Sequence, residues 1–84
     1  MKKYCAWRDQ IEEVEVIRET AKYVMLPPYG HRDAKRSDNR NYFDTWEEAR
    51  QFLIDREKTA IVDLLAKVKQ HQETLRKLQE MSQP

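Results

Sequence analysis

The 84-residue chain contains one glycine and three prolines, and none of these lies between residues 31 and 83. Glycine and proline are the residues that most often end a helix. Their absence means that nothing in the second half of the sequence forces a helix to stop before Pro84. A helix from Thr45 to Met81 would be roughly 55 Å long at 1.5 Å per residue. Such a helix is too long to pack along one small domain, so it must stand in water or pair with another chain.

Cysteine and long apolar runs are also scarce. Cys5 is the single cysteine, so no intrachain disulfide can form, and a lone cysteine is typical of a reducing compartment. The basic start Met1–Lys3 is not followed by an apolar run of signal-peptide length. No segment approaches the length of a membrane span. We therefore expect a soluble, cytoplasmic protein with no membrane partner.

Charge of neither sign dominates the sequence. Lysine and arginine number 16, and aspartate and glutamate number 15, so the formal net charge of +1 neither supports nor excludes nucleic acid as a partner. Carboxylates gather in residues 12–19 and basic side chains in residues 32–40. With so much of the chain in one helix, the core must be small, and small domains lie near the limit of stability. Dimerisation is a common remedy.

Residues Thr45–Glu48 predict where the helix begins. The Thr45 hydroxyl can accept a hydrogen bond from the amide of Glu48, and the Glu48 carboxylate can reach back to the amide of Thr45. Phe43 precedes this capping box and can pack against the start of the helix. At helical spacing, the first part of the helix can pack on a sheet through Trp46, Ala49, Phe52 and Leu53.

From Ile54 onward the apolar residues follow a seven-residue repeat, which is typical of coiled coils. The a positions are Ile54, Ile61, Val68 and Leu75, and the d positions are Glu57, Leu64, His71 and Leu78. Six of these eight residues are apolar, and Val62 and Leu65 widen the stripe. We predict a homodimer whose interface consists of Ile54, Ile61, Leu64, Val68, His71, Leu75 and Leu78. The pattern leaves parallel and antiparallel pairing open, as well as a helical hairpin with a break at residues 55–58.

The N-terminal half predicts strands. Residues 11–18 alternate valine with glutamate, which indicates a half-buried strand. Residues 22–26 form a second strand that Pro27–Gly30 must end, and a short third strand lies near Arg32–Arg36. Residues 4–7 are candidates for one more short strand.

The predicted fold class is therefore α+β. A small antiparallel three-stranded β-meander is followed by one long C-terminal helix that self-associates as a coiled coil. Residues 1–56 hold the meander and the first helical turns, and residues 57–84 hold the helical extension.

No set of residues assembles into a catalytic or metal site. Cys5 and His31 are the candidate nucleophile and base, but no glycine-rich loop or orienting partner accompanies them. Cys5 fits a small buried apolar residue better, and His31 fits a solvated loop. His71 lacks the neighbouring ligands that zinc requires, so a polar d residue that sets the register is the favoured interpretation. We predict no enzyme activity, no metal and no cofactor.

The basic segment is the best signal for nucleic acid. Arginine and lysine neutralise phosphates, and aromatic rings stack on bases. Asp33 and Asp38 dilute the positive charge, and a solvated edge strand whose charges prevent aggregation is the favoured alternative. The candidate contacts for nucleic acid or a partner are Tyr29, Arg32, Lys35, Arg36 and Arg40, with Tyr42 as a second stacking ring.

Residues Tyr42–Ala49 read YFDTWEEA, and this run resembles small phage and prophage proteins of unassigned function. Residues 14–20 and 34–37 add to the resemblance, which covers residues 11–56. It implies a phage or mobile-element origin and carries over no catalytic residue. Small accessory phage proteins often bind and block a host protein, including defence nucleases. Taken with the long amphipathic helix and the lack of a catalytic set, the resemblance leads us to expect a non-enzymatic, dimeric inhibitor of a host defence or nucleic-acid-handling protein in the host cytoplasm. The basic segment gives the alternative, a nucleic-acid-binding protein.

Overall fold

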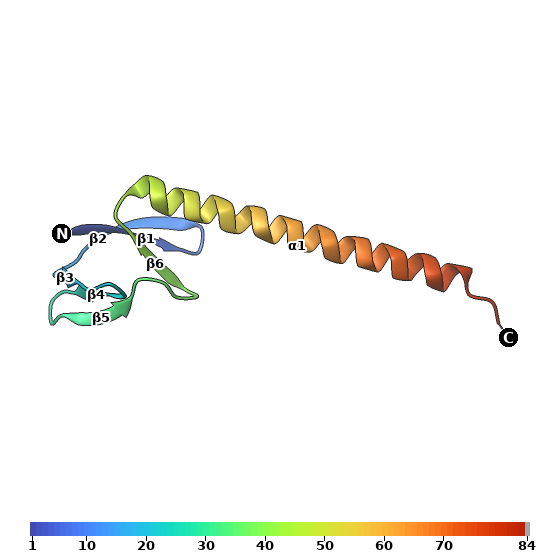
Figure 1. Ribbon diagram of the computed structural model, residues 1–84, viewed down its shortest axis with the longest axis horizontal. Helices are drawn as coiled ribbons and strands as arrows, with labels where there is room; N and C mark the ends of the chain where they lie inside the picture. The colour runs from blue at the N-terminus through green and yellow to red at the C-terminus, as the bar shows by residue number, and fades with distance from the viewer. Residues whose placement is uncertain (84) are drawn as a thin grey trace. The chain divides into compact units, whose positions relative to one another are not determined.

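The computed structural model describes residues 1–83, which form six β-strands followed by one α-helix (Figure 1). The α+β class predicted from the sequence is confirmed. The chain divides into two units, Met1–Ile54 and the segment from Asp55 onward, and each is described by itself. The first unit holds the strands and the start of the helix.

The first sheet has the strand order β2–β1–β6. Its central strand β1 (Lys2–Trp7) pairs antiparallel with β2 (Gln10–Glu15) and with β6 (Arg40–Phe43). The turn between β1 and β2 includes Arg8, whose φ of 58° lies in the left-handed region. β1 therefore pairs on one side with β2, the next strand in sequence, and on the other with β6, the last strand before the helix.

The second sheet has the order β3–β4–β5, and its strands are β3 (Arg18–Glu19), β4 (Tyr23–Leu26) and β5 (His31–Ala34). Thr20 and Tyr23 close the turn between β3 and β4. The Thr20 amide donates to the Tyr23 carbonyl at 2.9 Å, and the Tyr23 amide donates to the Thr20 hydroxyl at 3.1 Å. The turn Pro27–Gly30 then ends β4, as predicted, with Gly30 at a φ of 73°.

The two sheets are connected at two places, once by the chain itself and once by a backbone hydrogen bond. The Val16 amide donates to the Met1 carbonyl at 2.7 Å, whereas the next amide, of Ile17, donates to the Met25 carbonyl at 2.8 Å. The chain changes sheets between these two residues. On the other side, the Tyr42 amide donates to the Lys35 carbonyl at 2.9 Å. One core cluster joins residues of both sheets, namely Cys5, Val16, Val24 and Tyr42.

The predicted three-stranded antiparallel meander is present in part as the second sheet, whereas the expectation of a single sheet is wrong, because the strands form two three-stranded sheets. The predicted strand 11–18 is split where the chain changes sheets. Residues 4–7 belong to a longer strand that occupies the centre of the first sheet. The predicted third strand near Arg32–Arg36 is present as β5, at the edge of the second sheet. Tyr42 and Phe43 return to the core as predicted, and they do so within β6.

The helix α1 (Trp46–Glu80) begins as predicted. The Glu48 amide donates to the Thr45 hydroxyl at 3.1 Å, which satisfies one of the free amides of the first turn. Ala49 is fully buried, and its small side chain lies in a cluster with Ala6 and Phe43. The ring centroids of Phe43 and Phe52 lie 5.2 Å apart.

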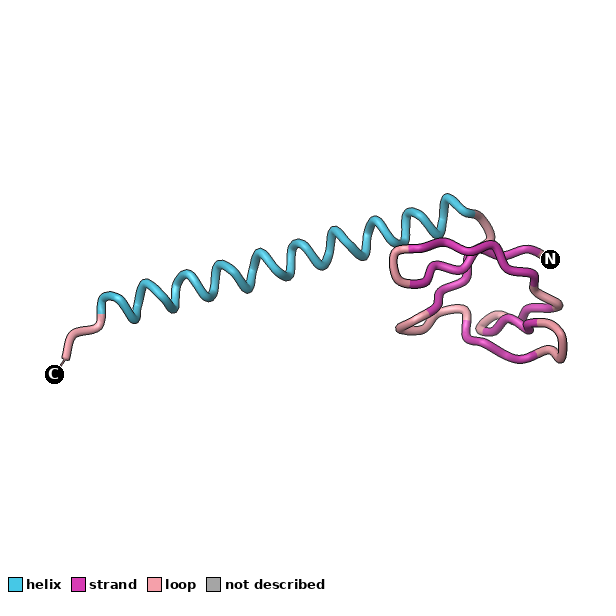
Figure 2. The backbone as a smooth tube through the Cα atoms, turned by 180° about the vertical axis from the view of Figure 1, so that it is seen from behind, coloured by secondary structure: helices cyan, strands magenta, loops and turns pink. Residues whose placement is uncertain are grey.

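Two expectations about α1 need correction. Trp46 is not buried against the sheet, because its side chain is 47% exposed in the turn that precedes the buried Ala49. The helix also continues without a break through residues 55–58, so the helical hairpin is wrong (Figure 2). Its 35 residues end within one residue of the predicted Met81.

An exposed apolar face of α1 as the candidate interaction site

Between Ile61 and Leu78, α1 carries a stripe of apolar side chains that the chain itself leaves in water. Single exposed apolar residues are common on protein surfaces, but a contiguous set is typical of an interaction site. We call this set the α1 stripe. Its side chains are between 50% and 65% exposed, and its members are Ile61, Val62, Leu64, Leu65, Val68, Leu75 and Leu78.

The spacing of the α1 stripe suits a second helix. Ile61, Val68 and Leu75 recur every seven residues, and a straight α-helix drifts by about 20° over each such repeat. The stripe therefore winds slowly around α1. A partner helix that keeps contact with it must wind in the left-handed sense, which is the geometry of a coiled coil.

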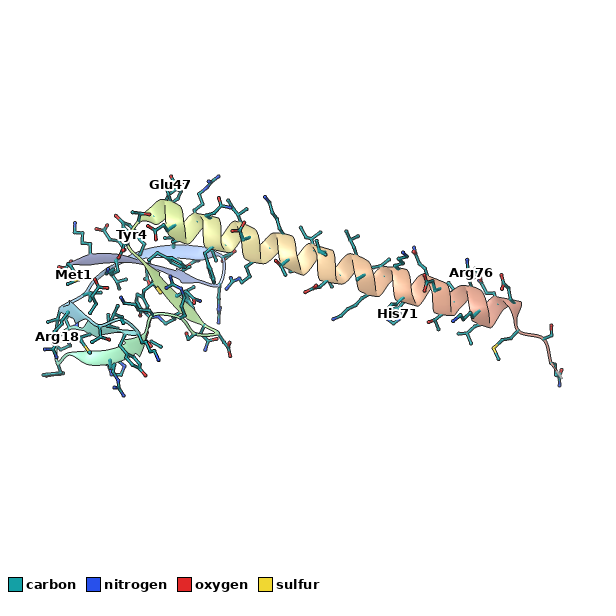
Figure 3. The ribbon with its side chains drawn as sticks, viewed as in Figure 1. Met1, Tyr4, Arg18, Glu47, His71 and Arg76 are labelled. Carbon is teal, nitrogen blue, oxygen red and sulfur yellow. The ribbon has the colours of Figure 1, made fainter. Side chains whose placement is uncertain are left out.

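The structure distinguishes the two ends of the predicted interface. Ile54 is half-buried and belongs to the first unit, whereas Ile61 is 54% exposed. The exposed part of the repeat therefore starts at Ile61. We call the a and d positions from Ile61 to Leu78 the seam. His71 is exposed on the same helix (Figure 3) and is the one polar residue of the seam. The pairing of these residues with another chain stays a prediction.

The positions that flank the seam carry little charge. Between residues 58 and 81 the e positions are Lys58, Leu65, Gln72 and Gln79, and the g positions are Ala60, Lys67, Thr74 and Met81. Two of these eight residues are charged, and both are lysines. The face is therefore mostly apolar or neutral, and charge repulsion across it would be small.

The first unit contains a polar pocket of about 350 Å³ whose walls include Lys3, Glu19, Lys35 and Asp44. Lys3 is buried and forms ion pairs with Asp44 and with Glu19, the latter at 2.9 Å, and Lys35 pairs with Glu19 at 2.7 Å. The hydrogen bond to Asp44 raises the pKa of Lys3, and those from Lys35 and then Lys3 lower the pKa of Glu19. These charges pair with one another, which indicates a structural role that joins β1, β3 and the segment between β6 and α1.

Sequence reasoning did not identify this ion-pair cluster. Lys3 follows a basic N-terminus and is expected in water, since lysine is rarely buried unless it is paired. Its partners lie 16 and 41 residues away. No local pattern in the sequence brings these three residues together.

Much of the predicted basic segment is engaged within the first unit. Lys35 pairs with Glu19, as described above. The Arg36 guanidinium lies 4.1 Å from the centroid of the Phe43 ring and donates to the backbone carbonyls of Lys35 and Tyr42. Arg32 lies 4.5 Å from the centroid of the Tyr23 ring. Contacts of this kind hold the guanidinium groups against the protein surface.

The two tyrosines next to the basic segment differ sharply. Tyr42 is 2% exposed, and its hydroxyl donates to the Asp33 carboxylate at 2.6 Å. Burial, followed by this hydrogen bond, raises the pKa of Tyr42. Arg40 covers the ring at 5.6 Å from its centroid, so Tyr42 cannot stack on a base. Tyr29, at the turn before β5, is 95% exposed.

Cys5 and His31, the candidate nucleophile and base, lie in different surroundings. Cys5 is fully buried in the core, and His31 is exposed on the edge strand β5. Within residues 1–83, no group of three or more histidine, cysteine or carboxylate side chains is placed to hold a metal ion. In the same part of the chain, no helix has both the length and the apolar character needed to cross a membrane.

No protein-family model, curated protein or solved structure matches the chain. Inference about its function therefore depends on the geometry of its own residues.

Proposed function

We propose that this protein is a non-enzymatic interaction protein of the phage accessory type, which forms a homodimer through α1 and blocks a host protein of defence or nucleic-acid handling. The observation that carries the proposal is the α1 stripe. It leaves apolar surface exposed on a helix that extends well past the strands in sequence.

The size of the α1 stripe supports self-association of moderate strength. Full burial of a Leu, Ile or Val side chain stabilises by about 1.5–3 kcal/mol, so burial of the exposed half contributes about 1 kcal/mol. A pair of stripes buries on the order of 1,000 Å², which is near the lower limit for a stable protein interface. We therefore expect a dissociation constant in the micromolar range rather than an obligate dimer.

The resemblance of residues 42–49 to phage proteins supports the choice of a host protein as target. The mixed charges of the first unit favour a protein partner over a polyanion. Trp46 is the first residue to test in that contact, because exposed tryptophans are frequent anchors in protein interfaces.

Two measurements test the proposal. Sedimentation at high micromolar concentration should give a dimer, and Leu64→Asp/Leu75→Asp should give a monomer, because buried unpaired charges are strongly unfavourable. Affinity capture from bacterial lysate should then recover a specific protein with the parent chain. Recovery of the same proteins by an unrelated coiled coil, or of none, would contradict the proposed inhibitor function.

Nucleic-acid binding is the second candidate, and the exposure of Tyr29 beside the edge strand that carries Arg32 is the observation that favours it. A gel-shift titration with single-stranded and double-stranded DNA and RNA tests it. Binding should weaken steeply with salt and should weaken further in Tyr29→Ala. Absence of a shift at low salt would remove this candidate.

A further inference from the structure

The a and d positions of α1 between Ile61 and Leu78 have the same spacing when they are read in either direction. These seam positions run from Ile61 to Leu78 in steps of three, four, three, four and three residues. A second copy that runs in the opposite direction can therefore overlap the whole segment. We propose that α1 pairs with α1 of a second copy as an antiparallel two-stranded coiled coil, with the centre of the overlap between Lys69 and Gln70. This inference rests on the self-association proposed above.

The antiparallel register matches the large apolar side chains of the two copies. Ile61 of one copy faces Leu78 of the other, and Leu64 faces Leu75. These pairs make up four of the six layers in the seam, because each occurs twice. All four side chains are 54–59% exposed in the single chain, so each has surface left to bury.

The polar d residues favour this direction. In a parallel pair in register, each d residue faces its own copy, so Glu57 would face Glu57 and His71 would face His71. Two carboxylates that face each other at short range repel. In the antiparallel pair His71 instead faces Val68, and Glu57 lies beyond Leu78, the last seam residue of the other copy. In this register neither Glu57 nor His71 faces the same residue of the other copy.

The parallel alternative gains little at its N-terminal end. Ile54 would add one layer there, but its side chain is already half-buried in the first unit. The flanking charges do not oppose the antiparallel register, which sets Lys67 beside Thr74 and Lys58 beside Gln79. The macrodipoles of two antiparallel helices also attract each other.

Spin labels at three positions on one side of α1 test the direction. Asp63, Gln70 and Lys77 are each replaced by cysteine in separate full-length Cys5→Ala proteins, and one label per chain reports the distance between copies. Along the helix axis, the antiparallel register separates the two labels by about 20 Å at position 63, 2 Å at position 70 and 22 Å at position 77. The measured distance combines this axial separation with the separation of the labels across the coiled coil, which is the same at all three positions. The distances at 63 and 77 should therefore exceed the distance at 70 by on the order of 8 Å.

Crosslinking of the unmodified protein provides a second measurement, in case Cys5→Ala disturbs the core. Lys58 and Lys77 lie about 28 Å apart along one helix, and they lie equally far apart between two parallel copies. In the antiparallel register Lys58 of one copy lies about 6 Å along the axis from Lys77 of the other. A short amine-reactive crosslinker should therefore join Lys58 to Lys77 only in the antiparallel pair.

The outcomes separate this inference from the proposed function. Equal label distances at the three positions, or absence of the Lys58–Lys77 crosslink in a protein that sediments as a dimer, overturn the antiparallel arrangement and leave self-association intact. A mass of three or four chains overturns the two-stranded pair. A monomer at high micromolar concentration removes the proposed self-association itself.

Discussion

Leu64 and Leu75 are the side chains whose truncation should weaken self-association most directly, because they face each other in the proposed pair. The double variant Leu64→Ala/Leu75→Ala is suited to this test, since alanine has the highest helix propensity and should preserve α1. The two leucines are 59% and 55% exposed in the single chain, so about half of each side chain is newly buried on pairing.

The magnitude follows from the carbons that are removed. Each Leu→Ala change deletes three carbons at about 0.8 kcal/mol per buried methylene, and burial of half of that surface amounts to about 1 kcal/mol. Four leucines change in a pair, so association should weaken by about 4 kcal/mol. This loss corresponds to an increase in Kd on the order of a thousandfold.

Sedimentation over a range of concentrations measures Kd. Far-ultraviolet circular dichroism checks that the variant is as helical as the parent chain diluted until it is a monomer. Val62→Ala is the matched control, because Val62 is 65% exposed but lies at a b position, outside a two-stranded seam. Its Kd should change by less than about threefold. The two-stranded model fails if the double leucine variant keeps the parent Kd, or if Val62→Ala weakens association as much as Leu64→Ala does.

Three further predictions concern the first unit. Thr45→Ala should lower the free energy of unfolding by about 1 kcal/mol in urea titrations, and Thr45→Ser should retain the cap. Trp46→Ala should lower it by about 2 kcal/mol, because about half of the side chain is in water, and a loss of about 4 kcal/mol or more would contradict its exposure. Glu19 has a lowered pKa in the folded state, so its carboxylate stabilises the fold above its ordinary pKa of 4.5, and this stability is lost as the pH falls through the lowered value. The melting temperature of Glu19→Gln, measured by thermal denaturation at several pH values, should fall less than that of the parent as the pH is lowered. An equal fall in both proteins would contradict the ion-pair role.

The helix was predictable because its signals are local. The cap at Thr45 lies three residues from its donor, and the absence of glycine and proline between Gly30 and Pro84 leaves α1 uninterrupted. The same is true of the seven-residue repeat that defines the α1 stripe. Signals of this kind depend on residues within one or two turns of each other, so they can be recognised without knowledge of the rest of the fold.

The two sheets were not predictable in the same way, because their pairings are distant in sequence. Tyr4 of β1 pairs with Phe43 of β6, and no pattern near Tyr4 indicates this partner. A central strand is also covered on more than one side, which removes the alternation that marks a half-buried strand. Cys5 and Ala6 are neighbours, for example, and both are fully buried.

Trp46 shows how a helical pattern can mislead at the start of a helix. The spacing from Trp46 to Ala49 and Leu53 places all three on one side of α1, and hydrophobicity alone predicts burial for all of them. Ala49 contacts the first sheet closely because its side chain is small. The turn before it projects the indole into water, and only the packed structure shows where the sheet contacts begin.

The stability of the helix beyond Asp55 and its association are coupled. Helices in folded proteins gain most of their stability from packing of an apolar face, and the chain itself offers the α1 stripe no such packing within residues 1–83. Side-chain pairs that place an acidic residue four positions before a lysine, such as Asp63 with Lys67 and Glu73 with Lys77, contribute only about 0.2–0.5 kcal/mol each. A second copy supplies the missing contacts, and it does so most fully in the register that matches Leu64 with Leu75. The helical content of this segment should therefore rise with protein concentration, whereas the first unit, which has its own core, should not depend on it.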